Sequence, residues 1–253
     1  MEPARLSAPS TPDSPPASAV LPSTEWGRVA LVGAGPGDAE LLTLKAARLL
    51  ASARVVLYDN LVSDEVLRHI PEDAERIFVG KQSSNHTLPQ EGIIELMVRL
   101  AKAGKSLVRL KGGDPYIFGR GGEEAEALIA EGIACETVPG ISAAQGASAS
   151  TGIPLTHRDH TNMLVFATGH LQGEGEERSV ALDWAALARP RQTVVIYMGV
   201  GTLPVICAKL AEHGLSGHTP AALVERATRP DQRTIVGTLE TLPALSVRHG
   251  VHP

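Results

Sequence analysis

Short apolar runs alternate with longer amphipathic segments along most of the chain, starting at Gly27. An apolar run bounded by Gly and Pro is typical of a buried strand, and apolar residues spaced three and four apart are typical of a helix. Strands that alternate with helices favour a mostly parallel sheet covered by helices on both faces. The expected order is strand 28–32, helix 39–51, strand 54–58, helix 63–70, strand 76–79, helix 91–103, strand 106–110, helix 122–131, strand 135–138 and helix 142–150.

A second unit follows residues 151–161, whose Gly-Ile-Pro stretch and charged residues predict a linker. The same patterns then predict strand 162–168, a polar loop 169–180, helix 183–188, strand 193–198, helix 203–213, and strands 221–224 and 233–237. The chain is therefore expected to form two α/β domains, over residues 27–150 and 162–253. Residues 1–26 are rich in Pro, Ser and Ala and predict a disordered tail, because they cannot bury enough apolar surface to offset the entropy of ordering.

Three of the expected strands end in glycine-rich turns. The turns read Gly33-Ala34-Gly35-Pro36-Gly37-Asp38, Lys111-Gly112-Gly113-Asp114-Pro115 and Pro139-Gly140-Ile141-Ser142-Ala143-Ala144. Glycine at the carboxyl end of a strand lets the backbone approach a ligand closely, and open α/β sheets bind ligands outside these strand ends. Several such turns in one domain predict a single shared small-molecule site.

The first turn partly matches a dinucleotide-binding pattern. Gly33 and Gly35 follow a strand and precede a helix, and Asp59 ends the next strand. However, the sixth position of the pattern is Asp38, whose charge would repel phosphates, and Pro36 removes a backbone N–H from the loop. The turn therefore favours a cofactor without phosphates, with a nicotinamide-dependent oxidoreductase as the alternative.

The second turn carries the most specific chemistry. Asp114, Tyr116, Phe118 and Arg120 gather there in a chain with only 3% aromatic residues. Asp114 either contacts a ligand hydroxyl or ammonium, or caps a turn locally. His157 and His160 have the spacing of metal ligands, but no third ligand is evident and no metal is expected.

Composition restricts the class of protein. The 253 residues are 43% hydrophobic and carry a net charge of −5, which argues against a protein that coats nucleic acid. The two cysteines lie far apart without a CxxC spacing, which argues against a disulfide framework or a zinc site and fits a reducing compartment. No apolar stretch approaches the roughly 20 residues of a membrane span. These features predict a cytoplasmic protein that binds neither membrane nor nucleic acid.

An ordered set of motifs makes a family resemblance specific. The motifs VGAGPGDAELLTLKA, VVLYDNLVS, VGK, PQE, VRLKGGDPYIFGRGGEE, VPGISAA, GIPLTHRD, TGH and YMG occur in this order between about residues 29 and 237. In order and spacing they closely resemble the uroporphyrinogen-III C-methyltransferases, which are tetrapyrrole (precorrin) methylases.

This resemblance implies a two-domain α/β methylase that works as a homodimer and binds S-adenosylmethionine in the cleft between its domains. It implies two methyl transfers to uroporphyrinogen III, giving precorrin-2 for sirohaem or cobalamin; another precorrin methylase is the alternative. By motif, Asp59 matches the family's proposed proton acceptor and Lys81 its proposed proton donor. The matching cofactor contacts are Pro36, Gly112, Gly113, Asp114, Ile117, Ser142, Ala143, Met198 and Ala227.

The implied substrate carries many carboxylates, so its site must be locally basic in a chain of negative net charge. Candidate substrate-binding residues are Lys111, Arg120 and Arg158, and arginine is the better clamp because its planar fork bonds both carboxylate oxygens. Family members usually finish with a Pro-Ala-(apolar run)-Gly strand that residues 249–253 do not match. The C-terminal domain is therefore expected to lack its last strand, and a non-catalytic binding module is a third hypothesis.

Overall fold

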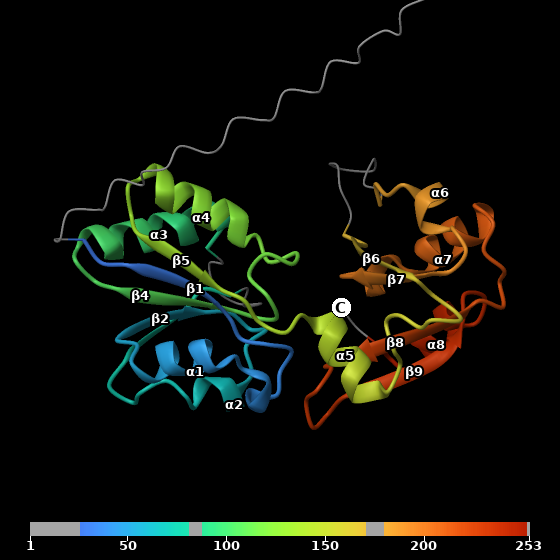
Figure 1. Ribbon diagram of the computed structural model, residues 1–253, viewed down its shortest axis with the longest axis horizontal. Coiled ribbons are helices and arrows are strands. Elements are labelled where there is room, and N and C mark those ends of the chain that lie inside the picture. The colour runs from blue at the N-terminus through green and yellow to red at the C-terminus, as the bar shows by residue number, and fades with distance from the viewer. Residues whose placement is uncertain (1–25, 81–87, 171–179, 252–253) are drawn as a thin grey trace, which may run out of the picture.

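A parallel five-stranded sheet organises the N-terminal half of the chain (Figure 1). The computed structural model describes residues 26–80, 88–170 and 180–251. The strand order is β3-β2-β4-β1-β5, and every pair is parallel. The strands are β1 (Val29–Gly33), β2 (Val55–Tyr58), β3 (Glu75–Phe78), β4 (Leu107–Lys111) and β5 (Cys135–Val138). The α/β fold class predicted from the sequence is confirmed.

Helices cover both faces of this sheet, as a parallel sheet requires. One apolar cluster packs the sheet against the helices α1 (Leu44–Ala51) and α2 (Asp64–Leu67). A second cluster packs the opposite face against α3 (Gln90–Lys102) and α4 (Gly121–Ala130). Both clusters consist mostly of Ala, Val, Leu and Ile, which is how a chain with 3% aromatic residues forms its core.

The C-terminal half contains two short sheets that do not pair with each other among the described residues. In Figure 1, helix α5 (Ala143–Thr151) lies between the two halves. The other elements are β6 (Met163–Thr168), α6 (Trp184–Leu187), β7 (Gln192–Tyr197), the 3-10 helix η3 (Val200–Thr202), α7 (Leu203–Glu212), β8 (Pro220–Glu225), β9 (Arg233–Thr238) and α8 (Leu242–Arg248). Their core gathers residues of α7, β9 and α8, including Ile206, Leu210, Ile235 and Leu242.

Strands β6 and β7 pair parallel, but β8 and β9 pair antiparallel. A parallel pair needs a crossover of a dozen or more residues, and the connection 226–232 is too short to provide it. The mostly parallel arrangement predicted for the whole chain therefore holds in the N-terminal sheet and the β6–β7 pair only.

The prediction of one continuous helix over residues 39–51 is wrong. The chain forms a 3-10 turn, η1 (Ala39–Leu41), and then α1. The Asp38 carboxylate accepts the Glu40 N–H at 2.8 Å, and Thr43 Oγ1 accepts the Ala46 N–H at 3.1 Å. Asp and Thr side chains at these positions accept hydrogen bonds from the otherwise unpaired N–H groups of a first helical turn. Asp38 therefore begins η1, and Thr43 begins α1 as a separate helix.

Three sequence predictions fall at least partly outside the described residues. The structure does not describe residues 1–25 of the predicted tail or residues 171–179 of the predicted polar loop. Lys81, the predicted proton donor, is the first residue of the undescribed range 81–87. Within the described ranges, no helix is both long and apolar enough to cross a membrane.

Helix α4 provides a matched pair of substitutions for testing the core. Leu128 is fully buried and Ile129, the next residue, is 66% exposed. We expect Leu128→Ala to lower the free energy of unfolding by about 2–5 kcal/mol, because it removes buried methyl groups and leaves a cavity. Ile129→Ala is expected to change it by less than about 0.5 kcal/mol. Urea denaturation followed by circular dichroism measures both, and equal losses would contradict this packing.

Candidate functional site

The three glycine-rich turns lie side by side at the carboxyl edge of the sheet. They follow β1, β4 and β5, which are neighbours in the order β4-β1-β5. Gly35 and Gly113 exchange backbone hydrogen bonds of 3.2 and 2.7 Å. A Cβ atom on Gly33 would lie 2.5 Å from the Gly140 nitrogen and 2.7 Å from the Gly113 oxygen. No side chain fits there, so glycine is required for the turns to touch backbone to backbone.

Asp114 ties two of these turns together. One carboxylate oxygen accepts the Tyr116 N–H at 2.8 Å, and the other accepts the Gly140 N–H at 3.1 Å. Both bonds go to backbone groups of the turns themselves. The structure therefore supports the local role that the sequence left open for Asp114, while its predicted ligand contact stays a prediction.

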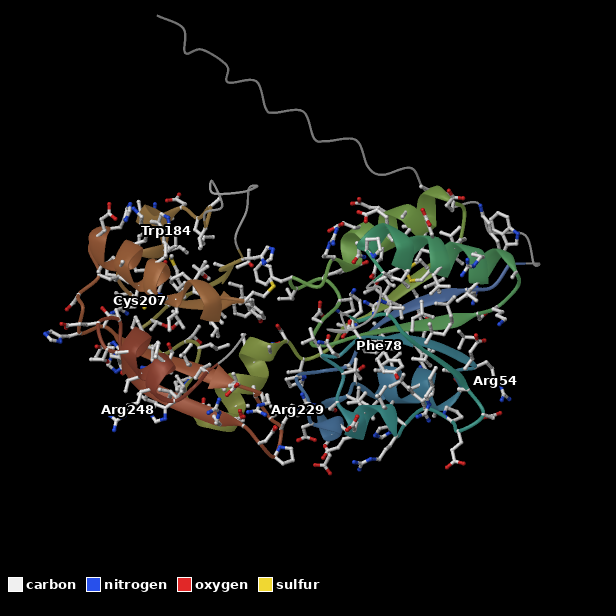
Figure 2. All side chains as sticks on the ribbon, turned by 180° about the vertical axis from the view of Figure 1, so that it is seen from behind. Arg54, Phe78, Trp184, Cys207, Arg229 and Arg248 are labelled. Atoms are coloured by element: carbon white, nitrogen blue, oxygen red, sulfur yellow. The ribbon has the colours of Figure 1, made fainter. Side chains whose placement is uncertain are left out.

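The first turn also meets the C-terminal half of the chain. The Asp38 N–H donates to Thr228 Oγ1 at 3.1 Å. A Cβ atom on Gly37 would lie 2.6 Å from Arg229 Cγ, and one on Gly146 would lie 2.5 Å from Pro36 Cγ. Arg229 is labelled in Figure 2, where it lies at the boundary between the two halves. The loop 226–229 thus places Ala227 next to the turn that contains Pro36, both predicted cofactor contacts.

Tyr197, at the end of β7, joins the third turn to the C-terminal half. Its hydroxyl bonds to Ser142 Oγ and accepts the Ala144 N–H at 3.2 Å, at the start of α5. The Phe118 ring packs against the Tyr197 ring with 4.9 Å between centroids. Met198 follows at φ +55°, a conformation that is uncommon for a side chain of this size, and is 56% exposed. Ser142 and Met198, both predicted cofactor contacts, are therefore joined through one tyrosine.

Three further predicted cofactor contacts lie in the second turn or directly after it. Gly112 leaves room for Leu61, because a Cβ atom there would lie 2.6 Å from Leu61 Cβ. Ile117 is 37% exposed. Gly113 has φ +66°, and a Cβ atom there would be in van der Waals contact with the third turn, 3.7 Å from the Ala143 nitrogen and 3.9 Å from the Ser142 Cα. The second and third turns therefore approach each other closely through backbone atoms.

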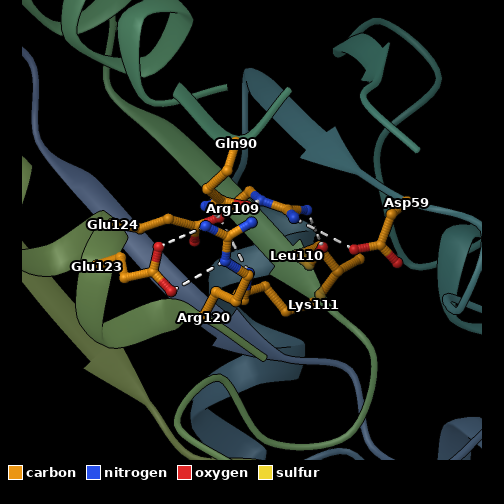
Figure 3. A network of polar contacts seen from close by, with 8 residues as sticks. All are labelled: Asp59, Gln90, Arg109, Leu110, Lys111, Arg120, Glu123 and Glu124. Atoms are coloured by element: carbon orange, nitrogen blue, oxygen red, sulfur yellow. Dashed lines mark hydrogen bonds and ion pairs between the residues drawn. The ribbon is translucent and has the colours of Figure 1, made fainter. Parts of the chain in front are cut away.

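Buried charges lie beneath the same edge (Figure 3). Arg109, with 4% of its side chain exposed, donates from Nη2 to the Asp59 carboxylate at 3.2 Å and from Nη1 to the Leu110 carbonyl at 2.9 Å. The other Asp59 oxygen accepts the Leu61 N–H at 3.1 Å. Asp59 is therefore held by two bonds at the end of β2.

Glu124 is the counter-charge of this cluster. Its Oε1 atom accepts from Arg109 Nε at 3.3 Å, Lys111 Nζ at 3.0 Å and Gln90 Nε2 at 3.0 Å. Burial and the neighbouring Arg109 lower the pKa of Lys111, and the Glu124 carboxylate counteracts this only in part. Lys111, predicted to bind substrate carboxylates, is here buried and bonded to Glu124.

The other two predicted clamp residues are exposed. Arg120 has φ +58° and forms a two-bond ion pair with Glu123, at 2.6 and 2.9 Å. This hydrogen bonding raises the pKa of the Arg120 guanidinium further above its already high value. Arg158 is exposed and makes no side-chain ion pair within the described part of the chain. Arg158 is thus free to meet an anion, while Arg120 would have to exchange Glu123 for one.

The histidines and cysteines that the structure describes form no assembled metal site. His157 and His160 pack ring to ring at 4.7 Å within a turn closed by the His157–Thr161 bridge. In the described ranges, no three His, Cys, Asp or Glu side chains gather in a way that could hold a metal ion. Burial raises the pKa of the Cys135 thiol to about 11 and that of Cys207 above its usual value, so both thiols stay protonated near neutral pH.

A family model describing tetrapyrrole (corrin/porphyrin) methylases matches residues 28–243. That range includes all the turns described above. The chain belongs to the tetrapyrrole methylases.

Relatives and solved structures agree with this membership of the tetrapyrrole methylases. The chain is 56% identical over 220 residues to a sirohaem synthase of Nitrosospira multiformis, covering 87% of this chain and 46% of that protein. A sirohaem synthase of Azotobacter vinelandii is 56% identical over 225 residues, covering 89% and 48%. The chain thus spans about half the length of the curated relatives that it matches.

Solved methylases match over nearly the whole chain. Uroporphyrin-III C-methyltransferase from Thermus thermophilus is 42% identical, with a TM-score of 0.75 over 90% of this chain and 89% of that one. The same enzyme complexed with S-adenosyl homocysteine matches equally well. Cobalt precorrin-4 methyltransferase, a cobalamin biosynthetic enzyme, is 27% identical with a TM-score of 0.78 over 92% and 95%.

Sequence reasoning missed two residues of this methylase site, Glu124 and Tyr197. Glu124 occupies the apolar stripe of α4 together with Ala125 and Leu128, where a glutamate is unexpected. That mismatch was visible in the sequence, as were two cations in the apolar strand β4. Tyr197 opens the YMG motif, but that motif does not indicate the role of its hydroxyl, whose hydrogen-bond partners are more than fifty positions away in the chain.

The Tyr197 hydroxyl offers a direct test of the contact between the two halves of this methylase. Tyr197→Phe keeps the ring but removes the bonds to Ser142 and the Ala144 N–H. We expect a loss of about 1 kcal/mol in unfolding free energy and faster hydrogen exchange of the Ala144 amide. Tyr116→Phe is the matched control, because the Tyr116 hydroxyl bonds to Thr137 Oγ1 at an exposed position. Unchanged Ala144 exchange in Tyr197→Phe would contradict the contact.

Proposed function

We propose that this chain is an S-adenosylmethionine-dependent C-methyltransferase that converts uroporphyrinogen III to precorrin-2 by two methyl transfers, for sirohaem or cobalamin. The observation that carries the proposal is the 42% identity to a uroporphyrin-III C-methyltransferase over about nine tenths of both chains. The lower identity to the precorrin-4 enzyme, 27%, makes another precorrin methylase the second candidate.

We place the methyl donor against the three turns and the two segments that the C-terminal half adds to them. The residues present fit such a ligand, because Gly113 carries no side chain and the third turn faces it with the Ala143 nitrogen and the Ser142 Cα, so a ligand can approach backbone atoms of both turns. Bound there, the donor would supply an activated methyl group on sulfur. The remaining contacts proposed for it are Pro36, Gly112, Asp114, Ile117, Met198 and Ala227.

The protein's own contribution to the reaction is alignment and proton removal. Methyl transfer needs an aligned nucleophile in a dry, preorganised pocket, and here that nucleophile is an electron-rich pyrrole carbon of the macrocycle. A proton must afterwards leave the substrate, and Asp59 is the proposed acceptor at the end of β2. Lys81, the proposed donor, lies outside the described residues.

Arg120 and Arg158 are the proposed clamps for the carboxylates of the substrate. Both are exposed, and a guanidinium bonds both oxygens of a carboxylate. We further propose that the active form is a homodimer in the cytoplasm that needs no metal. Sedimentation at micromolar concentration would test the dimer.

The decisive test of the function is anaerobic incubation with uroporphyrinogen III and methyl-labelled S-adenosylmethionine. We expect two labelled methyl groups per macrocycle and the precorrin-2 chromophore after oxidation. Label transfer only to precorrin-2 would favour a later precorrin methylase. Tight NAD binding with no transfer would favour an oxidoreductase, and donor binding without transfer to any tetrapyrrole would favour a non-catalytic binding module.

Donor binding is expected to depend on the Gly113 backbone. A valine there would be strained at φ +66° and would extend toward Ala143, into the proposed donor space. Gly113→Val should weaken S-adenosylhomocysteine binding at least about tenfold, equivalent to about 1.4 kcal/mol. Gly122→Val is the control, since a Cβ atom on Gly122 meets nothing within 4 Å. Calorimetric titration measures both, and normal binding by a folded Gly113→Val protein would remove this turn from the donor site.

Asp59→Asn is expected to lower turnover much more than donor affinity. The amide keeps the shape of the side chain but cannot accept the substrate proton, so the loss should be roughly 100-fold or more in kcat. S-adenosylhomocysteine affinity should stay within about twofold. Steady-state kinetics together with titration measure the two effects, and full turnover would leave Asp59 with a structural role only.

Substrate binding is expected to depend on charge. Arg158→Ala and Arg120→Ala should raise KM for uroporphyrinogen III and leave donor affinity unchanged. Added salt should raise the wild-type KM, because exposed charge contacts are screened over about 8–10 Å near physiological ionic strength. Arg191→Ala is a control on a neighbouring exposed arginine that bonds the Arg158 and Asp159 carbonyls. A salt-independent KM would count against a basic substrate site.

A further inference from the structure

Glu124 is a fully buried glutamate that is linked through Arg109 to Asp59, the proposed proton acceptor. The proposed mechanism assigns no role to Glu124. Glu124 has no exposed side-chain surface and lies in the apolar stripe of α4. Its Oε2 atom has no hydrogen-bond partner among the described residues, while Oε1 accepts from Gln90, Arg109 and Lys111. Burying a carboxylate and two cations is costly even when they are paired. Aliphatic residues at all three positions would avoid this cost.

The strand register explains how Arg109 can bond both Glu124 and Asp59. Arg109 lies opposite Leu57 in the β2–β4 pair. Side chains alternate along a strand, so Asp59 falls on the same face as Leu57, the face that α3 and α4 cover. The Arg109 guanidinium spans the gap, with Nε bonded to Glu124 and Nη2 bonded to Asp59 (Figure 3).

We infer that Glu124 is a positioning residue for the proposed methyl transfer, acting through Arg109 to fix the Asp59 carboxylate toward the substrate. Glu124 holds one edge of the guanidinium, the Leu110 carbonyl holds another, and the remaining edge is presented to Asp59. Arginine is needed between the two carboxylates because its planar fork carries donors in fixed directions, whereas a lysine ammonium is a single point of charge.

This inference rests on the proposed function, and its test separates the two. Turnover of uroporphyrinogen III, KM, S-adenosylhomocysteine affinity and thermal stability are measured for the wild-type chain, Glu124→Gln, Arg109→Lys and two controls. Glu126→Gln removes an exposed glutamate of the same helix. Leu128→Ala weakens the same buried stripe without touching the charges.

We expect Glu124→Gln to lower kcat about 10- to 100-fold, because a small misplacement of a catalytic group has effects of this size. KM and S-adenosylhomocysteine affinity should stay within about twofold. Arg109→Lys should show the same split, and it keeps the inference testable if Glu124→Gln does not fold. Glu126→Gln should resemble the wild type, and Leu128→Ala should lose thermal stability but keep kcat at temperatures where it is folded.

Two results would overturn the inference while leaving the proposed function in place. One is wild-type kcat in folded Glu124→Gln or Arg109→Lys. The other is a loss of kcat in Leu128→Ala as large as in Glu124→Gln, which would reduce Glu124 to a structural role. No turnover by the wild-type chain would instead overturn the proposed function, and this inference with it.

Discussion

Backbone contact among three glycines determines the geometry on which the site depends. Gly33, Gly113 and Gly140 end or follow adjacent strands, and a Cβ atom on Gly33 would lie within 2.7 Å of the backbone of both other turns. Because these turns touch without side chains between them, each turn fixes the position of the other two. The C-terminal half adds contacts to the first and third turns through the loop 226–229 and Tyr197. A methylase that must align two ligands benefits from this close, rigid backbone edge.

The buried charges beneath this edge are the second constraint. A parallel strand that is buried on both faces ordinarily carries apolar residues, yet β4 carries Arg109 and Lys111. Glu124 pairs with both cations, and Asp59, which pairs with Arg109, supplies the second negative charge. The arrangement therefore connects the helix α4, the central strand β4 and the proposed proton acceptor in one network. Its cost in desolvation is understandable if the position of Asp59 matters for the reaction.

Much of this organisation could be predicted from the sequence. Hydrophobic periodicity and the Gly and Pro positions predicted the order of strands and helices. The glycine-rich turns do lie together at one sheet edge, while the small-molecule site predicted from them stays a prediction. Two errors came from local signals that the hydrophobic pattern does not include. The caps Asp38 and Thr43 split one predicted helix, and a short connection made β8–β9 antiparallel. Lys111 shows a further limit, because its burial depends on Glu124, which belongs to another element. Spacing alone could not distinguish a buried counter-ion from a free substrate clamp.

In the proposed site, segments from both halves of the chain bind one donor molecule. Hydrogen–deuterium exchange with and without S-adenosylhomocysteine tests this arrangement, because it reports each segment separately. We expect simultaneous protection of residues 33–38, 111–117, 142–146, 197–199 and 226–229, with β3 and α8 unchanged. Protection confined to the turns of one half, or centred away from these segments, would contradict it.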